Sequence, residues 1–326
     1  MLTKIHMVAA INQALRQEMS KDKSVVILGE DVGVDGGVFR VTDGLIKEFG
    51  KERVIDTPLA EAGIIGVSIG MAVNGLRPVP EIQFDGFTYQ AFHHIKQHMA
   101  RFSQRSSGTF HLPIVLRAPC GGGVRALEHH SESPEAFFVH SQGIKVVMPS
   151  GPYDAKGLLL SAIRDPDPVI FLEPKKCYRS FKEEVPEEEY TIPLGEATIK
   201  REGKDVTLIT WGAMVRVCLE AADKLKEENI DVEIIDLRTI WPLDTEKIIE
   251  SVKKTKRAVI VHEATRAGGM GGEIAARIQE KCLYNIEAPI LRVTGFDVPY
   301  PQFALEDYFM PDVFRVIKNV RKVMNY

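Results

Sequence analysis

The sequence predicts an α/β protein built from two doubly wound domains. Short runs of aliphatic and β-branched residues alternate with segments of helical periodicity along the whole chain. Most of these runs are apolar throughout, which is typical of parallel strands covered by helices on both faces. The length of 326 residues also favours two domains, at roughly 150 residues per domain.

The expected strands follow one another in two series. In the first half they are Val25–Leu28, Arg53–Asp56, Val79–Phe84, Ile114–Arg117, Lys145–Met148 and Val169–Leu172. In the second half they are Val206–Thr210, Val232–Asp236, Ala258–Val261 and Ile290–Val293, with helices at Glu220–Glu228, Thr245–Lys254 and Glu273–Cys282. The first 22 residues are expected to form one amphipathic helix.

A charged segment separates the two series. Residues 182–190, KEEVPEEEY, contain five glutamates and a proline, and we expect a solvated linker there. The predicted domains are therefore 1–185 and 186–326. Because ligands bind at the carboxyl ends of strands in open parallel sheets, residues that directly follow strands are the first candidates for a site.

Composition excludes several classes of protein. With 41 basic and 45 acidic residues the net charge is −4, so no basic excess indicates nucleic-acid binding. The four cysteines are widely spaced, which argues against a disulfide scaffold or zinc site. No apolar run is long enough to predict a membrane helix. The N-terminal segment carries Glu18 and Asp22 and is unlike a targeting peptide, which favours a bacterial or archaeal cytoplasm, although a processed mitochondrial chain would look similar.

Two carboxylates and a helix start are the first candidates for chemistry. Glu30 and Asp31 follow the strand Val25–Leu28, where they could bind a cation, transfer protons or lie in a solvated loop. In DTPLAEAGIIGVSIGMAVNG, Thr57 resembles an N-cap and Pro58 a first helical residue. No charged residue occurs from Ala62 to Val73, which predicts a buried helix with Glu61 as its one ionisable group. A buried carboxyl without a partner is a candidate for proton transfer; pairing with an Arg or Lys elsewhere is the alternative.

Further candidates follow other strands. Gln83 and Phe84 end a predicted strand, where they line a site or pack in the core. The glycines after Cys120 allow a ligand to approach the backbone, although the loop lacks the G-x-G-x-x-G pattern. His130 lies just before Ser133 and Pro134, which look like the start of a helix. A histidine in such a loop serves as an acid or base, or has only a structural role.

Three other motifs have weaker explanations. Ser68 lies in a G-x-S-x-G sequence, but inside a helical stretch, which disfavours a hydrolase nucleophile. His94 and His98 have the spacing of a zinc pair without an evident third ligand. The turn Gly268–Gly272 precedes a helix and either binds an anion or packs against another subunit.

The ordered motifs together resemble one family. The matching stretches are LGEDVG, GGVFR, DTPLAEAGIIG, EIQFDGF, HHSESPEAFF, GIKVVMPS, DAKGLLLSAIRDPDPVIFLEP, DVTLITWG, EIIDLRTIWPLD, HEA and RVTGFDVPYP. They resemble the beta subunit of the thiamine-diphosphate-dependent 2-oxo acid dehydrogenase (decarboxylating) component. GGVFR, EIQF, SPEAFF, the EEVP segment and the final MNY look most like the branched-chain type, with the pyruvate type next.

The resemblance implies a pyrimidine-binding N-terminal domain and a transketolase-type C-terminal domain. It assigns Glu61 to proton exchange with the aminopyrimidine of thiamine diphosphate, and His130 to proton transfer during acyl transfer to lipoamide. It places Gln83 and Phe87 around the aminopyrimidine, with Glu30 and Leu59 adjoining it. Glu132 stands where relatives more often have Gln and adds a negative charge beside His130.

The resemblance also implies ions and partners. A structural potassium ion would be held by Ile114, Ala162, Ile163, Asp165 and Asp167, the last in place of the usual Asn. The chain lacks the G-D-G motif that anchors Mg²⁺ and diphosphate, so an alpha subunit is expected to carry that half of the site. The expected assembly has two alpha and two beta chains, docks on a lipoyl-bearing acyltransferase core and decarboxylates a 2-oxo acid, with neither nucleic acid nor membrane as a partner.

Alternatives remain open at this stage. The substrate is a branched-chain 2-oxo acid, pyruvate or acetoin. The activity could instead be that of a single-chain ketol transferase, which the missing G-D-G and the short length disfavour. A subunit that only docks the core without catalysing anything is the remaining alternative.

Overall fold

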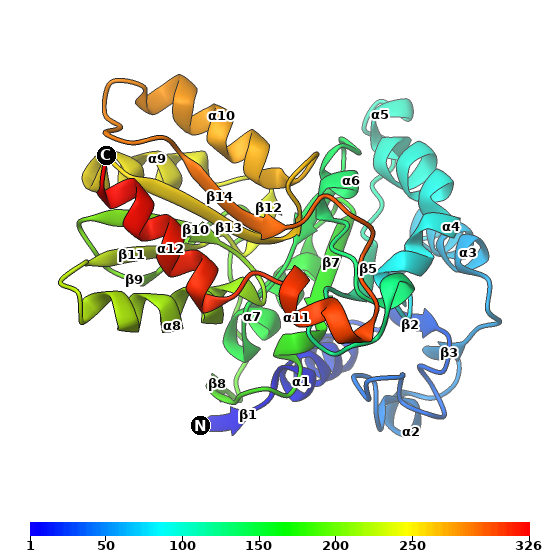
Figure 1. Cartoon of the computed structure of the whole chain (residues 1–326). Helices are drawn as coiled ribbons and strands as arrows, with labels where there is room; N and C mark the ends of the chain where they lie inside the picture. Colours follow the sequence, from blue (N-terminus) through cyan, green and yellow to red (C-terminus); the bar gives the residue numbers. More distant parts are fainter.

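The computed structural model describes all 326 residues and contains two mostly parallel sheets that lie side by side (Figure 1). The first has seven strands in the order β12-β6-β7-β5-β4-β2-β3. Its strands are β2 (Val25–Gly29), β3 (Val54–Asp56), β4 (Arg77–Glu81), β5 (Val115–Cys120), β6 (Lys145–Val147), β7 (Val169–Pro174) and β12 (Thr239–Trp241). Only the edge strand β12 pairs antiparallel to its neighbour.

The second sheet has the order β14-β13-β10-β11-β9. Its strands are β9 (Thr198–Arg201), β10 (Val206–Thr210), β11 (Val232–Asp236), β13 (Ala258–Thr265) and β14 (Leu291–Gly295). The edge strand β9 is antiparallel and the other four strands are parallel. Mostly parallel order in both sheets confirms the predicted α/β fold class.

Helices cover both faces of each sheet. On the first sheet α1 (Met7–Lys21) and α7 (Pro152–Arg164) pack on one face, and α3 (Glu61–Val73), α4 (Thr88–His93) and α6 (Glu135–Val139) pack on the other. On the second sheet α8 (Met214–Lys226) and α12 (Val313–Met324) lie opposite α9 (Thr245–Thr255) and α10 (Met270–Cys282). The remaining helices are α2 (Leu45–Phe49), α5 (Phe102–Arg105) and α11 (Glu306–Phe309). No helix has the length and apolar character needed to cross a membrane.

The two halves of the chain share their cores. One apolar cluster joins α1 and α7 of the first half to α8 and α12 of the second, and the other joins α3 and α6 to α9 and α10. Strand β12 comes from the second half of the chain but extends the sheet of the first. The boundary placed between residues 185 and 186 stays a prediction, because these contacts cross it.

The N-terminal helix and the linker were each predicted too long, for a common reason. The first residues form strand β1 (Leu2–Ile5), and α1 begins only at Met7. Strand β1 pairs antiparallel with β8 (Glu183–Pro186), which occupies part of the predicted linker. The glutamates after β8 bind basic groups: Glu188 pairs with the N-terminal ammonium at 2.7 Å and Glu189 with Lys21 at 2.9 Å. Residues 183–189, whose charge predicts a solvated loop, are therefore held in place by pairing with the N-terminal segment of the chain.

The start of α3 also differs from the prediction. The Thr57 N–H still bonds to the Gly29 carbonyl at 2.9 Å, so the chain stays attached to the sheet and the helix begins only at Glu61. Thr57 and Pro58 are therefore not its cap and first residue. The helix is also not buried all round, because Val67 is 54% exposed and a Cβ on Gly66 or Gly70 would meet no atom within 4 Å. One face packs on the sheet and the other is an open apolar surface.

Candidate active site at the carboxyl edge of the first sheet

The parallel strands of the first sheet bring several predicted residues to one edge. Glu30 follows β2 directly, and Gln83 lies two residues after β4 ends. The Gln83 side-chain amide donates a 2.9 Å hydrogen bond to Asp31, which joins these two strand ends. The strand expected to reach Phe84 ends at Glu81, so Gln83 and Phe84 lie in the loop beyond the sheet.

Glu61 is the buried acid of this edge. It is the first residue of α3 and is 2% exposed, and its Oε2 has no hydrogen-bond partner. Glu30 lies close enough to be affected: burial raises the pKa of Glu30, and the negative charges of Glu61 and Asp31 raise it further. Two neighbouring carboxyls, one of them with a raised pKa, are suited to holding and passing a proton.

The predicted apolar residues Leu59 and Phe87 lie in the loops before α3 and after β4. Leu59, two residues before Glu61, is 75% exposed although it is a large aliphatic residue. Phe87 packs edge-to-face on Phe84, with ring centroids 5.8 Å apart. Both loops follow parallel strands that pair with β2, so this aromatic and aliphatic surface belongs to the same edge of the sheet as Glu61.

His130 belongs to the same aromatic cluster. It ends the short 3₁₀ turn Glu128–His130, and its ring lies edge-to-face on Phe84 at 4.2 Å and on Phe87 at 5.3 Å. Burial lowers the pKa of His130, and the positive charges of Lys175 and His129 lower it further. The imidazole is therefore neutral at pH 7 and can accept a proton.

Lys175 and Asp85 complete this region and were not predicted. Both side chains are fully buried, and the Lys175 ammonium lies 3.7 Å from the Asp85 carboxylate. Neither side chain has a hydrogen-bond partner. Burial raises the pKa of Asp85 well above its ordinary range, although Lys175 opposes the shift. The sequence signal that could have identified Lys175 is its position, because it directly follows β7 at the carboxyl edge of the first sheet.

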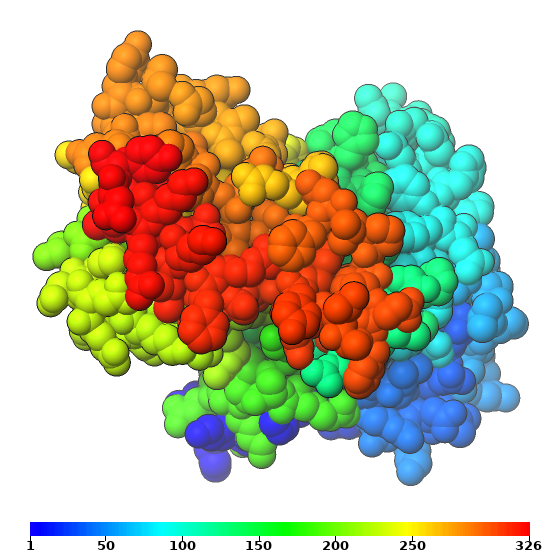
Figure 2. Space-filling view, in the orientation of Figure 1, coloured from blue at the N-terminus to red at the C-terminus, as the bar shows by residue number.

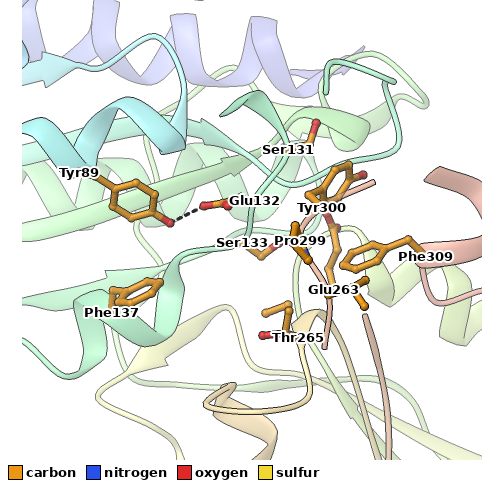
Figure 3. Close-up of a pocket in the computed structure, with 12 residues that line it drawn as sticks. Tyr89, Ser131, Glu132, Ser133, Phe137, Glu263, Thr265, Pro299, Tyr300 and Phe309 are labelled. Carbon is orange, nitrogen blue, oxygen red and sulfur yellow. Dashed lines mark hydrogen bonds between the residues drawn. The ribbon is translucent and has the colours of Figure 1, made fainter. Parts of the chain in front are cut away.

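The hydrogen-bond partner of Glu132 is Tyr89, not His130. Its carboxylate accepts a 2.6 Å hydrogen bond from the Tyr89 hydroxyl (Figure 3). Burial and this bond raise the pKa of Tyr89. Tyr89 is thus the hydrogen-bond partner of the Glu132 carboxylate.

A cavity of about 390 Å³ lies behind the His130 turn, between the two halves of the chain. Figure 3 shows its walls: Tyr89, Glu132 and Phe137 come from the first half. Glu263, Tyr300 and Phe309 come from the second half. Burial raises the pKa of Glu263, a residue that motif reasoning did not select as a site residue.

The five residues expected to hold potassium gather where α7 ends and β5 and β7 begin. The carbonyls of Ile163 and Asp165 accept hydrogen bonds from Arg77 at 2.8 and 3.3 Å. The Asp165 carboxylate binds the Lys145 ammonium at 2.6 Å, and Asp167 lies 3.6 Å from the same group. The carbonyls of Ile114 and Ala162 accept backbone hydrogen bonds. Each carbonyl keeps a second lone pair, so potassium binding stays a prediction beside two competing cations.

Two weaker motifs have ordinary structural explanations. Ser68 is fully buried inside α3, and its hydroxyl donates to the Ile64 carbonyl at 2.8 Å, unlike an exposed nucleophile. The rings of His94 and His98 lie 5.7 Å apart in a π-helical turn. No group of three or more His, Cys, Asp or Glu side chains is arranged to hold a metal ion.

Comparison with known proteins identifies the family. Residues 3–180 match the transketolase pyrimidine binding domain, and residues 195–316 match the transketolase C-terminal domain. The chain is 50% identical over 325 residues to the "Pyruvate dehydrogenase E1 component subunit beta" of Bacillus subtilis, covering 100% of both chains. The proteins of that name from Staphylococcus epidermidis and Staphylococcus aureus match equally well, at 50% identity and full coverage.

A solved structure shares the fold. The chain named "Split gene transketolase, inactive beta4 tetramer" superposes with a TM-score of 0.80 at 23% identity, covering 99% of both chains. At that identity the likeness concerns the fold alone. Together with the full-length relatives, these matches show that the chain belongs to the transketolase-like beta subunits of the E1 component of 2-oxo acid dehydrogenases.

Proposed function

We propose that this chain forms one half of a thiamine-diphosphate site in an assembly of two alpha and two beta subunits. The assembly oxidatively decarboxylates a 2-oxo acid and transfers the acyl group to lipoyl groups of an acyltransferase core. The observation that carries the proposal is Glu61, a buried carboxyl whose Oε2 has no partner on this chain. A buried carboxyl left unpaired is costly, which favours a ligand that uses it.

The residues at the sheet edge fit the aminopyrimidine half of the cofactor. Glu61 would exchange a proton with the ring nitrogen, and the neighbouring Glu30 favours proton sharing because its pKa is raised. Gln83, Phe87 and Leu59 would line the aminopyrimidine with an amide and apolar surface. When bound, the cofactor supplies the electron sink for loss of carbon dioxide from the 2-oxo acid.

His130 would act in the transfer of the acyl group. Its imidazole is held by two aromatic rings and is neutral at pH 7, because burial and Lys175 lower its pKa. The incoming lipoyl group is a disulfide, whose S–S bond breaks as one sulfur takes the acyl group. A neutral ring nitrogen would accept the proton released as the acyl carbonyl forms, and the resulting imidazolium would deliver that proton to the sulfur that leaves.

Two observations support an alpha partner. The sequence lacks the G-D-G motif, so Mg²⁺ and the diphosphate would be held mainly by the other subunit. The exposed face of α3 is apolar and free of bulky side chains around Gly66 and Gly70, which allows another helix to pack closely. On this proposal the chain alone is inactive.

Pyruvate is the substrate that we propose first, because full-length relatives at 50% identity carry that name. A branched-chain 2-oxo acid is the second candidate, because GGVFR, EIQF and SPEAFF resemble the branched-chain type. The alpha subunit is expected to contribute part of the substrate pocket.

Dye-coupled decarboxylation by the native complex, purified through this chain, tests the proposal. Pyruvate and 3-methyl-2-oxobutanoate are compared with and without thiamine diphosphate and Mg²⁺. We expect cofactor-dependent activity in a fraction containing a second chain, and the rate ratio identifies the substrate class. Loss of all activity in Glu61→Ala separates a catalytic subunit from one that only docks the core, since the latter would leave catalysis untouched.

A further inference from the structure

We propose that the second half of the chain positions the His130 turn through two carboxyl groups, those of the partly buried Glu263 and the buried Glu306. Both are positioning residues that act through backbone N–H groups and do not touch the reacting atoms. The functional part of this inference rests on the role proposed above for His130. Its structural part rests on contacts between the two halves of the chain.

The segment to be positioned is the loop of residues 121–134, which connects β5 to α6 and contains His130. Its backbone is in the left-handed region at Gly121 and Gly123, with φ of +75° and +81°, and also at Arg125 and Leu127, with φ of 58° and 67°. Non-glycine residues hold that conformation only where surrounding contacts stabilise it. The Gly121 N–H donates to the Glu132 carbonyl at 2.7 Å, which closes the loop on both sides of His130.

Glu263, on strand β13, makes the first contact. Its carboxyl group accepts a hydrogen bond from the Gly122 backbone N–H. A Cβ on Gly121 would lie 2.8 Å from Glu263 Oε1, and a Cβ on Gly122 would lie 1.7 Å from the Tyr300 hydroxyl. The second half thus packs directly on backbone, where a larger residue would not fit.

Glu306, the first residue of α11, makes the second contact. It is 1% exposed, and its two oxygens accept hydrogen bonds from the Arg125 backbone N–H at 3.0 and 3.1 Å. The Tyr300 hydroxyl donates to the same carboxyl at 2.9 Å. The Arg125 guanidinium in turn pairs with Asp307 at 2.8 Å. Figure 2 shows this orange-red segment covering the green surface of the first half.

These contacts link the second half to the site. The N–H groups of Gly122 and Arg125 bond to carboxyl groups of the second half, and loss of either carboxyl group would remove that hydrogen bond from the loop. The ring of His130 depends on the same loop for its place beside Phe84. A displacement of the second half would therefore release the turn that carries His130.

The first test measures the loop itself. Hydrogen exchange of the backbone amides of residues 121–133 is followed by mass spectrometry in the purified complex. Glu263→Ala and Glu306→Ala should speed exchange of this segment at least about tenfold, the loss expected for a charge-assisted hydrogen bond. Glu263→Gln should restore slow exchange, because its amide oxygen accepts the same N–H. Glu280→Gln on the exposed surface of α10 is the matched control and should leave exchange unchanged.

The second test measures function as a ratio. Acylation of a lipoyl domain is compared with dye-coupled decarboxylation in the same preparation. Glu263→Ala should lower acylation about tenfold and dye-coupled turnover less, and Glu263→Gln should recover most of the ratio. A general loss of folding would lower both rates together.

The outcomes separate this inference from the proposed function. Unchanged exchange in both alanine variants would overturn the positioning role, whatever His130 does. A His130→Ala variant with normal acylation would refute the role of His130, and with it the functional half of the inference. Should the alanine variants fail to assemble, Tyr300→Phe removes only the hydroxyl bound to Glu306 and must still speed exchange at Arg125.

Discussion

Replacing Arg117 by methionine should strongly destabilise the first half of the chain. Arg117 is fully buried and donates to Glu81 at 2.7 Å and to Glu173 at 2.7 and 3.0 Å. The Tyr178 hydroxyl also donates to Glu173, at 2.6 Å. This network joins the adjacent strands β4, β5 and β7, whose carboxyl ends support the candidate site.

The size of the destabilisation follows from the two buried carboxyl groups that the substitution leaves unpaired. Without the guanidinium, two buried carboxyl groups lose the one cation between them, and breaking such a buried pair costs about 3–5 kcal/mol. A domain of this size loses roughly 2–4 °C of melting temperature per kcal/mol, so Arg117→Met should melt about 6–20 °C lower. The variant Glu81→Gln, Arg117→Met, Glu173→Gln should recover part of the loss, because it removes the unpaired charges.

Differential scanning calorimetry of the assembled complex measures the effect. The matched control is Arg321→Met, because Arg321 pairs with Glu228 at 2.6 Å on the surface and is 55% exposed. Exposed pairs contribute about 0–1 kcal/mol, so the control should melt within a few degrees of the parent complex. An Arg117→Met complex that melts no lower than the control would refute the reasoning.

Three further predictions concern the site and its pH dependence. Glu61→Gln should lower dye-coupled turnover about 10²–10⁴-fold with assembly intact on size exclusion, and near-normal turnover contradicts its proton-transfer role. Burial raises the pKa of Glu135 from 4.5 to about 8, so the folded state keeps a proton that the unfolded state releases, and stability falls as pH rises across that interval. Glu135→Gln should flatten the decline in melting temperature between pH 5 and 8; equal slopes refute this assignment. Thiamine diphosphate with Mg²⁺ at a hundredfold excess over Kd should stabilise the complex by about 2.7 kcal/mol, and an unchanged melting temperature argues against a cofactor site.

The sequence predicted most of what local pattern and strand order determine. The ten expected strands exist, and most of them are apolar runs that can be recognised without their partners. Glu30, Gln83 and His130 lie beyond the ends of parallel strands as the topological rule requires. The strands β1, β8, β9 and β12 were missed because they are short, contain polar residues and are stabilised by partners elsewhere in the sequence.

Side-chain partners were less predictable than positions. The charge of Glu132 pointed to an effect on His130, but a hydrogen bond from Tyr89, 43 residues earlier, binds its carboxylate instead. Lys175 and Asp85 come together only when β7 and the loop after β4 meet at the sheet edge. Such pairs depend on which strands are neighbours, and strand order is not encoded in any local motif.

The two faces of α3 differ in a way that fits the proposed site shared with a second subunit. Its inner face buries Ile64 and Ile65, which anchors the helix and places Glu61 at the sheet edge. Its outer face, and Leu59 just before it, expose apolar surface to water, and this exposed surface does not contribute to the stability of the folded chain. A polar residue on that face would suit an isolated chain. A second subunit that packs on the same edge would bury the apolar surface and place a ligand against the unpartnered carboxyl of Glu61, so one proposal accounts for both features.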